Sequence, residues 1–126
     1  MAHGSIYWSE LATSDVEAAK DHYAKIAGWT FEGMDMGGGT YWVASHDGRA
    51  IAGIMDLKLI PHPVPPHWLT YVAVDDMDAA MGIVADTGGK VIREPFDVPG
   101  VGIIAIVSEP GGGGYGLIEP APMPAS

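Results

Sequence analysis

The first half of the chain changes from a strand-like to a helix-like pattern of apolar and polar side chains. Residues 5–11 alternate with a period of two and carry large side chains on both sides, which is typical of a strand covered on both faces. From Val16 the apolar residues recur at helical spacing until Gly28, which can take the positive φ that ends a helix. Ser14 and Glu17 have the spacing of a capping box, so we expect Ser14 to cap this helix. Three strands are then predicted, over residues 29–35, 40–45 and 50–57.

The same order of elements returns after a proline-rich segment. Residues 58–67 contain four prolines and therefore predict a linker, because proline breaks helices and central strands. A strand is expected next, and then a helix that Asp75 caps and that ends before Gly88 and Gly89. The predicted strands and helix of this half cover residues 68–74, 76–86, 90–94, 101–108 and 115–119. We expect the tail, residues 120–126, to be mobile.

A shift of 61 residues aligns the two halves. Six identities fall within the segment 12–28, and Asp15 aligns with Asp76 and Gly28 with Gly89. The chain is therefore interpreted as an internal duplication of a βαβββ unit. We predict one α+β domain, residues 1–126, in which modules 5–57 and 68–119 form a curved mixed sheet around a cleft. Such a cleft is where a small ligand would bind.

Charge and composition narrow the classes of function. Sixteen acidic residues against six Lys and Arg give a formal net charge of −10, so binding to nucleic acid is not expected. The chain has no cysteine, which excludes thiol nucleophiles and thiolate metal sites. The apolar stretches are too short for a membrane helix, and residues 1–5 lack the features of a signal peptide. We therefore expect a cytoplasmic protein with no membrane partner.

Two sets of motifs are similar to a known superfamily. One is Trp8-Ser9-Glu10-Leu11, which leads into a helix that ends Ala27-Gly28-Trp29. The other is Pro66-His67-Trp68-Leu69-Thr70-Tyr71, followed by Gly88-Gly89 and Asp97-Val98-Pro99-Gly100. Together with the paired βαβββ units, they resemble the vicinal oxygen chelate superfamily of glyoxalase I, extradiol dioxygenases and bleomycin-resistance proteins. The resemblance implies the fold over residues 5–119, and it leaves the reaction open because this scaffold carries many chemistries.

The resemblance also implies where a metal would be held. Metal-dependent members place a His or Gln on the first strand of each unit and a Glu on the fourth. Those positions correspond here to Trp8, Leu69, Gly53 and Gly116, whose side chains are not metal ligands. We therefore predict no metal and no cofactor. A displaced site that uses other donors, such as Glu10 and His67, is the alternative.

Strand alternation selects the candidate site residues. Glu10 shares a strand face with Trp8, and His67 and Tyr71 share one with Leu69. We predict that Trp8, Trp42, His67, Leu69 and Tyr71 contact a ligand. Glu10 would meet a cation or hydroxyl, or act as a general base. For Trp42 the competing interpretation is core packing. For His67 it is a histidine at the entry of the strand with no role in function.

Three functions remain open from the residues alone. The first is a metal-free protein of the bleomycin-resistance kind that binds a small aromatic or cationic molecule. The second is a glyoxalase-like lyase, isomerase or dioxygenase with a rearranged metal site or with Glu10 as base. The third is an interaction module with a vestigial cleft. We also expect a homodimer, because each unit must find a partner sheet and either chain can provide it.

Overall fold

The computed structural model describes residues 3–35, 38–60, 63–98 and 101–121. The chain divides into two compact units. We call Trp8–Leu69 the first unit, and Met1–Tyr7 together with Thr70–Ser126 the second unit. Most of the predicted mobile tail, and Pro99-Gly100 of the motif above, lie outside the described residues.

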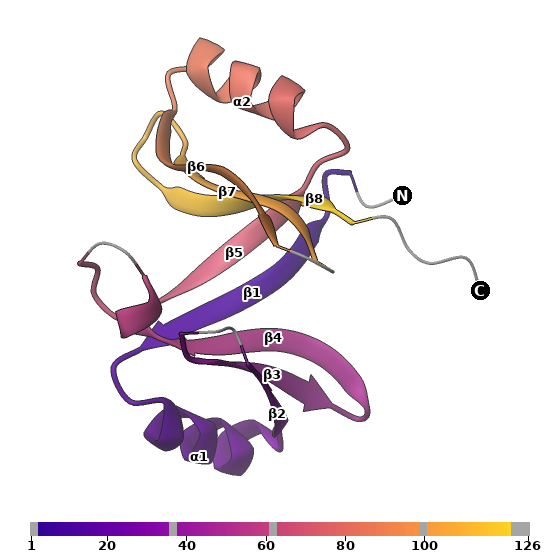
Figure 1. The fold of residues 1–126 in the computed structure, drawn as a ribbon, viewed down its shortest axis with the longest axis vertical. Coiled ribbons are helices and arrows are strands. Elements are labelled where there is room, and N and C mark those ends of the chain that lie inside the picture. Colours follow the sequence, from indigo (N-terminus) through magenta and orange to yellow (C-terminus); the bar gives the residue numbers. More distant parts are fainter. Residues whose placement is uncertain (1–2, 36–37, 61–62, 99–100, 122–126) are drawn as a thin grey trace. The chain divides into compact units, whose positions relative to one another are not determined.

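The first unit is a four-stranded mixed sheet with one helix (Figure 1). Its strand order is β2-β3-β4-β1, in which β1 runs parallel to β4 and the other neighbours are antiparallel. Helix α1 lies against one face of this sheet. The elements are β1 (Ile6–Thr13), α1 (Val16–Ala27), β2 (Thr30–Asp35), β3 (Thr40–His46), β4 (Arg49–Asp56) and a 3-10 turn (Leu57–Leu59).

The second unit repeats this arrangement. Its strand order is β5-β8-β7-β6, with β5 parallel to β8 and antiparallel pairs beyond. Helix α2 covers one face, and beneath it lies a core built around Met77, Val107 and Leu117. The elements are β5 (His67–Ala73), α2 (Met77–Asp86), β6 (Lys90–Val98), β7 (Gly102–Ser108) and β8 (Gly114–Pro120). The α+β class and the two tandem βαβββ modules are thus confirmed. The predicted module limits and the cleft stay predictions.

The helix caps differ from the sequence expectation by one residue in both modules. Asp15, not Ser14, caps α1, and Asp76, not Asp75, caps α2. Each aspartate accepts a hydrogen bond from the amide of the third helical residue, at 3.0 Å from Ala18 and 3.1 Å from Ala79. A carboxylate in extended backbone satisfies this amide directly, so no reciprocal box is needed. Gly28 ends α1 with a φ of 73°, as predicted.

Strand β6 is longer than predicted. The sequence prediction ended it at Glu94, but the strand continues to Val98 with two register shifts. β6 pairs only with β7 and is last in the strand order of its unit. A proline costs no ladder hydrogen bond when its strand is at an edge, so Pro95 is accommodated there.

Candidate functional site

Three polar side chains of the first unit meet on one face of its sheet. The indole Nε1 of Trp8 donates to the hydroxyl of Tyr41 at 2.8 Å. That hydroxyl in turn donates to Oε2 of Glu10, also at 2.8 Å. All three side chains are partly buried. We call these residues the Tyr41 network.

Gly53 makes this network possible. Strand β4 lies between β3, which carries Tyr41, and β1, which carries Glu10. Gly53 of β4 is the register partner of Glu10 on one side and of Val43 on the other. A Cβ added at Gly53 would overlap the Tyr41 hydroxyl. The tyrosine ring therefore crosses β4 only because this position has no side chain.

The network has a direction. The indole N–H can only donate a hydrogen bond, and it donates to the Tyr41 hydroxyl. The Tyr41 hydroxyl donates in turn to the Glu10 carboxylate, which is an acceptor when ionised. Hydrogen bonds to an ionised carboxylate are shorter and stronger than those between neutral groups. The Glu10 carboxylate is therefore the acceptor end of the network. The arrangement suits a ligand that brings a hydroxyl, an amine or another cationic group.

The positions at which metal-dependent superfamily members hold their metal do not fit a metal here. Trp8 uses its only polar atom as a donor to Tyr41. In the first unit the Tyr41 ring lies over Gly53, and in the second unit the Tyr71 ring lies over Gly116, its register partner on β8. In addition, the described part of the chain contains no group of three or more His, Asp or Glu placed to hold a metal ion. The absence of a metal stays a prediction.

Trp42 is not brought to the Tyr41 network. It neighbours Tyr41 on β3, so the two side chains point to opposite faces of the sheet. Lys20 of α1 places its Nζ 3.2 Å from the centre of the Trp42 ring. The side chain of Lys20 is only 18% exposed and pairs with Glu17 at 3.2 Å. The structure therefore places Trp42 on the face that carries α1, where it packs against the helix.

The other predicted residues lie on β5. The Nδ1 atom of His67 lies 2.7 Å from the carbonyl oxygen of Pro65, so the ring is tied to the linker that precedes it. Leu69 is half-buried in the first unit. Tyr71 belongs to the second unit and is 5% exposed, with its ring over Gly116. The ligand contacts of these residues stay predictions.

Sequence reasoning missed Tyr41 and an aromatic cluster. Tyr23 of α1 stacks on Trp29 with ring centres 4.9 Å apart, and Trp68 donates its Nε1 proton to the Tyr23 hydroxyl at 3.2 Å. The helical stripe that contains Tyr23 was visible in the sequence. The hydrogen-bond partners of Tyr41 were not visible in the sequence. They depend on the registers of β3 against β4 and of β4 against β1, which decide what the Tyr41 hydroxyl reaches.

Curated relatives of this chain are longer proteins. CFP32 of Mycobacterium tuberculosis, provisionally designated a glyoxylase, is 37% identical over an alignment of 117 residues, and the match covers 90% of this chain and 45% of the relative. The anthracycline biosynthesis protein DnrV of Streptomyces peucetius is 33% identical over 129 residues, with 92% of this chain and 47% of the relative covered. The chain thus spans about half the length of the curated relatives it matches.

Solved structures share the fold. A methylmalonyl-CoA epimerase from Mycobacterium tuberculosis matches with a TM-score of 0.65 and 19% identity over 91% of this chain and 87% of that one. A hypothetical protein from Bacillus halodurans C-125 matches with a TM-score of 0.72 and 13% identity over 98% and 99%. At these identities the likeness concerns the fold alone. Neither described helix is long and apolar enough to cross a membrane.

The sequence profile of one superfamily matches residues 5–114. This match includes both helices and all of β1 to β7, and it agrees with the motifs around Trp8 and His67. The chain therefore belongs to the Glyoxalase/Bleomycin resistance protein/Dioxygenase superfamily.

Proposed function

We propose that this chain binds a small aromatic molecule, bearing hydroxyl or amino groups, at the Tyr41 network and without a metal. The observation that carries the proposal is the Tyr41 hydroxyl, held between Trp8 and Glu10 at 2.8 Å from each. This hydroxyl is above Gly53, one of the positions where a metal-dependent member has a ligand. A hydrogen-bonded phenol and carboxylate would then take the place of the metal in orienting a ligand.

The chemistry around the network supports this class of ligand. The flat Trp8 indole offers a stacking surface, and Glu10 offers an acceptor for a hydroxyl or a cation. The formal net charge of −10 would favour the approach of a cationic compound. Two relatives, 33% and 32% identical, are named as anthracycline biosynthesis proteins. A fluorescent anthracycline that carries an amino sugar, such as daunorubicin, is therefore a suitable first probe.

Binding is tested by titration of the probe with observation of the indole N–H signals by NMR. We expect the Trp8 signal to shift with saturation, because its proton belongs to the network. Trp8→Ala should weaken binding by about 1–3 kcal/mol, as for a truncated aromatic anchor. Trp68→Ala is the matched control, since Trp68 packs on Tyr23. Equal affinity of the parent, Trp8→Ala and Trp68→Ala would place the site elsewhere.

An enzyme is the second candidate, and the Glu10–Tyr41 pair is the observation that favours it. A carboxylate 2.8 Å from a phenol could take a proton from a carbon next to a carbonyl group and return it to a neighbouring atom. Glu10→Gln separates the two candidates. In a binding protein it lowers the affinity for a cationic ligand. In an enzyme it suppresses turnover of a probe such as the adduct of glutathione and methylglyoxal, and leaves binding nearly intact.

Metal content and assembly complete the proposal. We expect elemental analysis of protein purified without a nickel column to find no stoichiometric divalent metal. One Ni, Zn, Fe, Mn or Mg per chain would contradict this.

We also expect a homodimer located in the cytoplasm. A mass near 13.2 kDa by light scattering at high micromolar concentration would argue against the dimer.

A further inference from the structure

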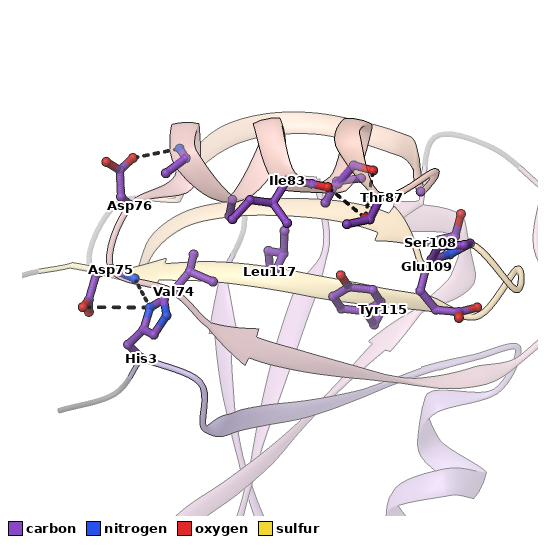
Figure 2. Close-up of a pocket in the computed structure, with 15 residues that line it drawn as sticks. His3, Val74, Asp75, Asp76, Ile83, Thr87, Ser108, Glu109, Tyr115 and Leu117 are labelled. Atoms are coloured by element: carbon purple, nitrogen blue, oxygen red, sulfur yellow. Dashed lines mark hydrogen bonds and ion pairs between the residues drawn. The ribbon is translucent and has the colours of Figure 1, made fainter.

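The second unit contains a cavity of about 320 Å³ between α2 and its sheet. Figure 2 shows Ile83 on the underside of α2, above Leu117 on β8. Val74, Val84 and Tyr115 complete an apolar lining. The volume is at the lower end of the range for pockets that bind small molecules.

The side chains along one stripe of α2 line the cavity. Asp76, Ala80, Ile83 and Thr87 follow one another at intervals of three or four residues, so they form one stripe along this helix. The anchors of α2 lie beside this stripe, where Met77 is 2% and Val84 7% exposed. Ala79 and Ala80 offer only methyl groups to the cavity, and Ile83 and Val84 are the larger side chains that line it from the helix. Met77 and Val84 pack on the core of the sheet, and the two small alanine side chains leave room for the cavity beside them.

The rim of the cavity is acidic. Asp75 and Asp76 lie at the N-terminal end of α2, and Glu109 lies near its C-terminal end, after β7 (Figure 2). Hydrogen bonds from the amides of Gly113 and then Gly111 hold the pKa of the Glu109 carboxyl below its ordinary value. Glu109 is thus ionised at neutral pH. No Lys or Arg occurs among the described residues that line the cavity.

His3 adds a polar group beside Asp75. Its Nδ1 accepts a hydrogen bond from the Asp75 amide at 3.0 Å and lies 3.9 Å from Oδ2 of the same residue. His3 thus binds the Asp75 backbone at this end of the rim through its Nδ1 atom. The lining thus combines an apolar interior with carboxylates at both ends.

We propose that this cavity is a second binding site, which takes a small apolar amine. The apolar body would lie between Ile83 and Leu117, and the ammonium group would meet a carboxylate of the rim. The acidic rim would at the same time disfavour anions of the same shape. This site is separate from the proposed function, because every residue of its lining belongs to the second unit and the Tyr41 network belongs to the first.

The test is a titration with two probes that share one apolar body, 2-phenylethylamine and 3-phenylpropanoate. Methyl NMR signals of Ile83, Val84 and Leu117 report on the cavity. We expect saturable shifts of these signals with the amine. The affinity for 3-phenylpropanoate should be at least about tenfold lower, because its carboxylate meets like charges at the rim, whereas the ammonium group meets opposite charges. Equal binding of both probes, or no shift with the amine, would overturn the proposal.

Two alanines of α2 provide matched variants. Ala79 and Ala85 are both exposed, and only Ala79 lines the cavity. Ala79→Leu should fill the cavity and weaken amine binding about tenfold or more, whereas Ala85→Leu should leave it unchanged. Ile83→Ala, at a position that is 61% exposed, removes part of the wall and should also weaken binding. Unchanged affinity in Ala79→Leu and Ile83→Ala would show that the amine binds elsewhere.

Discussion

The hydroxyl of Tyr41 donates to the carboxylate of Glu10 at 2.8 Å, although 31 residues separate them in the sequence. The bond crosses a whole strand, β4, because the intervening residue is Gly53. The second module has a related arrangement, in which Tyr71 lies over Gly116. A shift of 61 residues aligns Tyr71 with Glu10, so the two modules cover equivalent glycines from different strands. Both modules thus have a glycine at this position, and a tyrosine ring covers it from β3 in the first module and from β5 in the second.

Removal of the Tyr41 hydroxyl should destabilise the protein. Tyr41→Phe takes away the shared partner of Trp8 and Glu10, and each lost bond costs about 0.5–1.5 kcal/mol. The free energy of unfolding in urea should therefore fall by about 1–3 kcal/mol. Tyr7→Phe is the control, because Tyr7 is 42% exposed. If both variants lose the same stability, the network does not contribute to folding.

Replacement of Gly53 by alanine should lower the stability of the protein, whereas the same replacement at a glycine next to open space should not. Gly53→Ala forces the Tyr41 ring to move, and overpacking of this kind costs about 1–3 kcal/mol. Gly82→Ala places its methyl group in open space on α2, where alanine should stabilise the helix by about 0.5–1 kcal/mol. Urea unfolding of both variants measures the contrast.

A double variant tests whether the Tyr41 ring causes the loss of stability in Gly53→Ala. With Tyr41→Ala the ring is absent, so the additional cost of Gly53→Ala should nearly vanish. An undiminished cost would mean that the backbone of β4, and not the tyrosine, rejects the methyl group.

Glu119 should stabilise the start of α2. Its Oε1 accepts a hydrogen bond from the amide of Met77 at 2.7 Å, and Met77 is only 2% exposed. Glu119→Ala leaves this buried amide without its partner and should cost about 1–3 kcal/mol in thermal or urea unfolding. Glu119→Gln keeps an oxygen acceptor and should lose less. A surface comparison is Asp21→Ala, which breaks an exposed pair with Lys25 and should change stability by less than about 0.5 kcal/mol.

Glu109 should make stability depend on pH in the acidic range. Backbone amides lower the pKa of its carboxyl in the folded protein, with Gly113 at 2.6 Å as the main cause. A lowered pKa stabilises the fold fully above the ordinary glutamate pKa, and this stabilisation is lost as the pH falls through the lowered value. Glu109→Gln should therefore lose less stability than the parent on acidification. Parallel profiles of unfolding free energy against pH would contradict the assignment.

Local signals in the sequence predicted much of the fold. The repeat aligned Asp15 with Asp76, and these residues cap the two helices by the same bond to the third helical amide. The prediction of Ser14 and Asp75 as caps was wrong by one position, because neighbouring polar residues compete for a role that only backbone geometry assigns. The predicted end of β6 at Glu94 came too early, because the strand continues through Pro95 at an edge position, where a proline is tolerated.

The candidate site shows where prediction from sequence stops. Alternation along β1 was enough to place Trp8 and Glu10 on one face, because that relationship is local. Tyr41 and Trp42 are equally aromatic neighbours, and the sequence did not distinguish which of them faces Glu10. That choice depends on the register of β3 against β4 and of β4 against β1, and register is set by the packing of all four strands. The sequence by itself thus determined the duplicated βαβββ order and the superfamily, through local periodicity and motifs. Only the tertiary structure decided that Tyr41 crosses over Gly53 and that α2 leaves a cavity above its sheet, because both follow from contacts between distant segments.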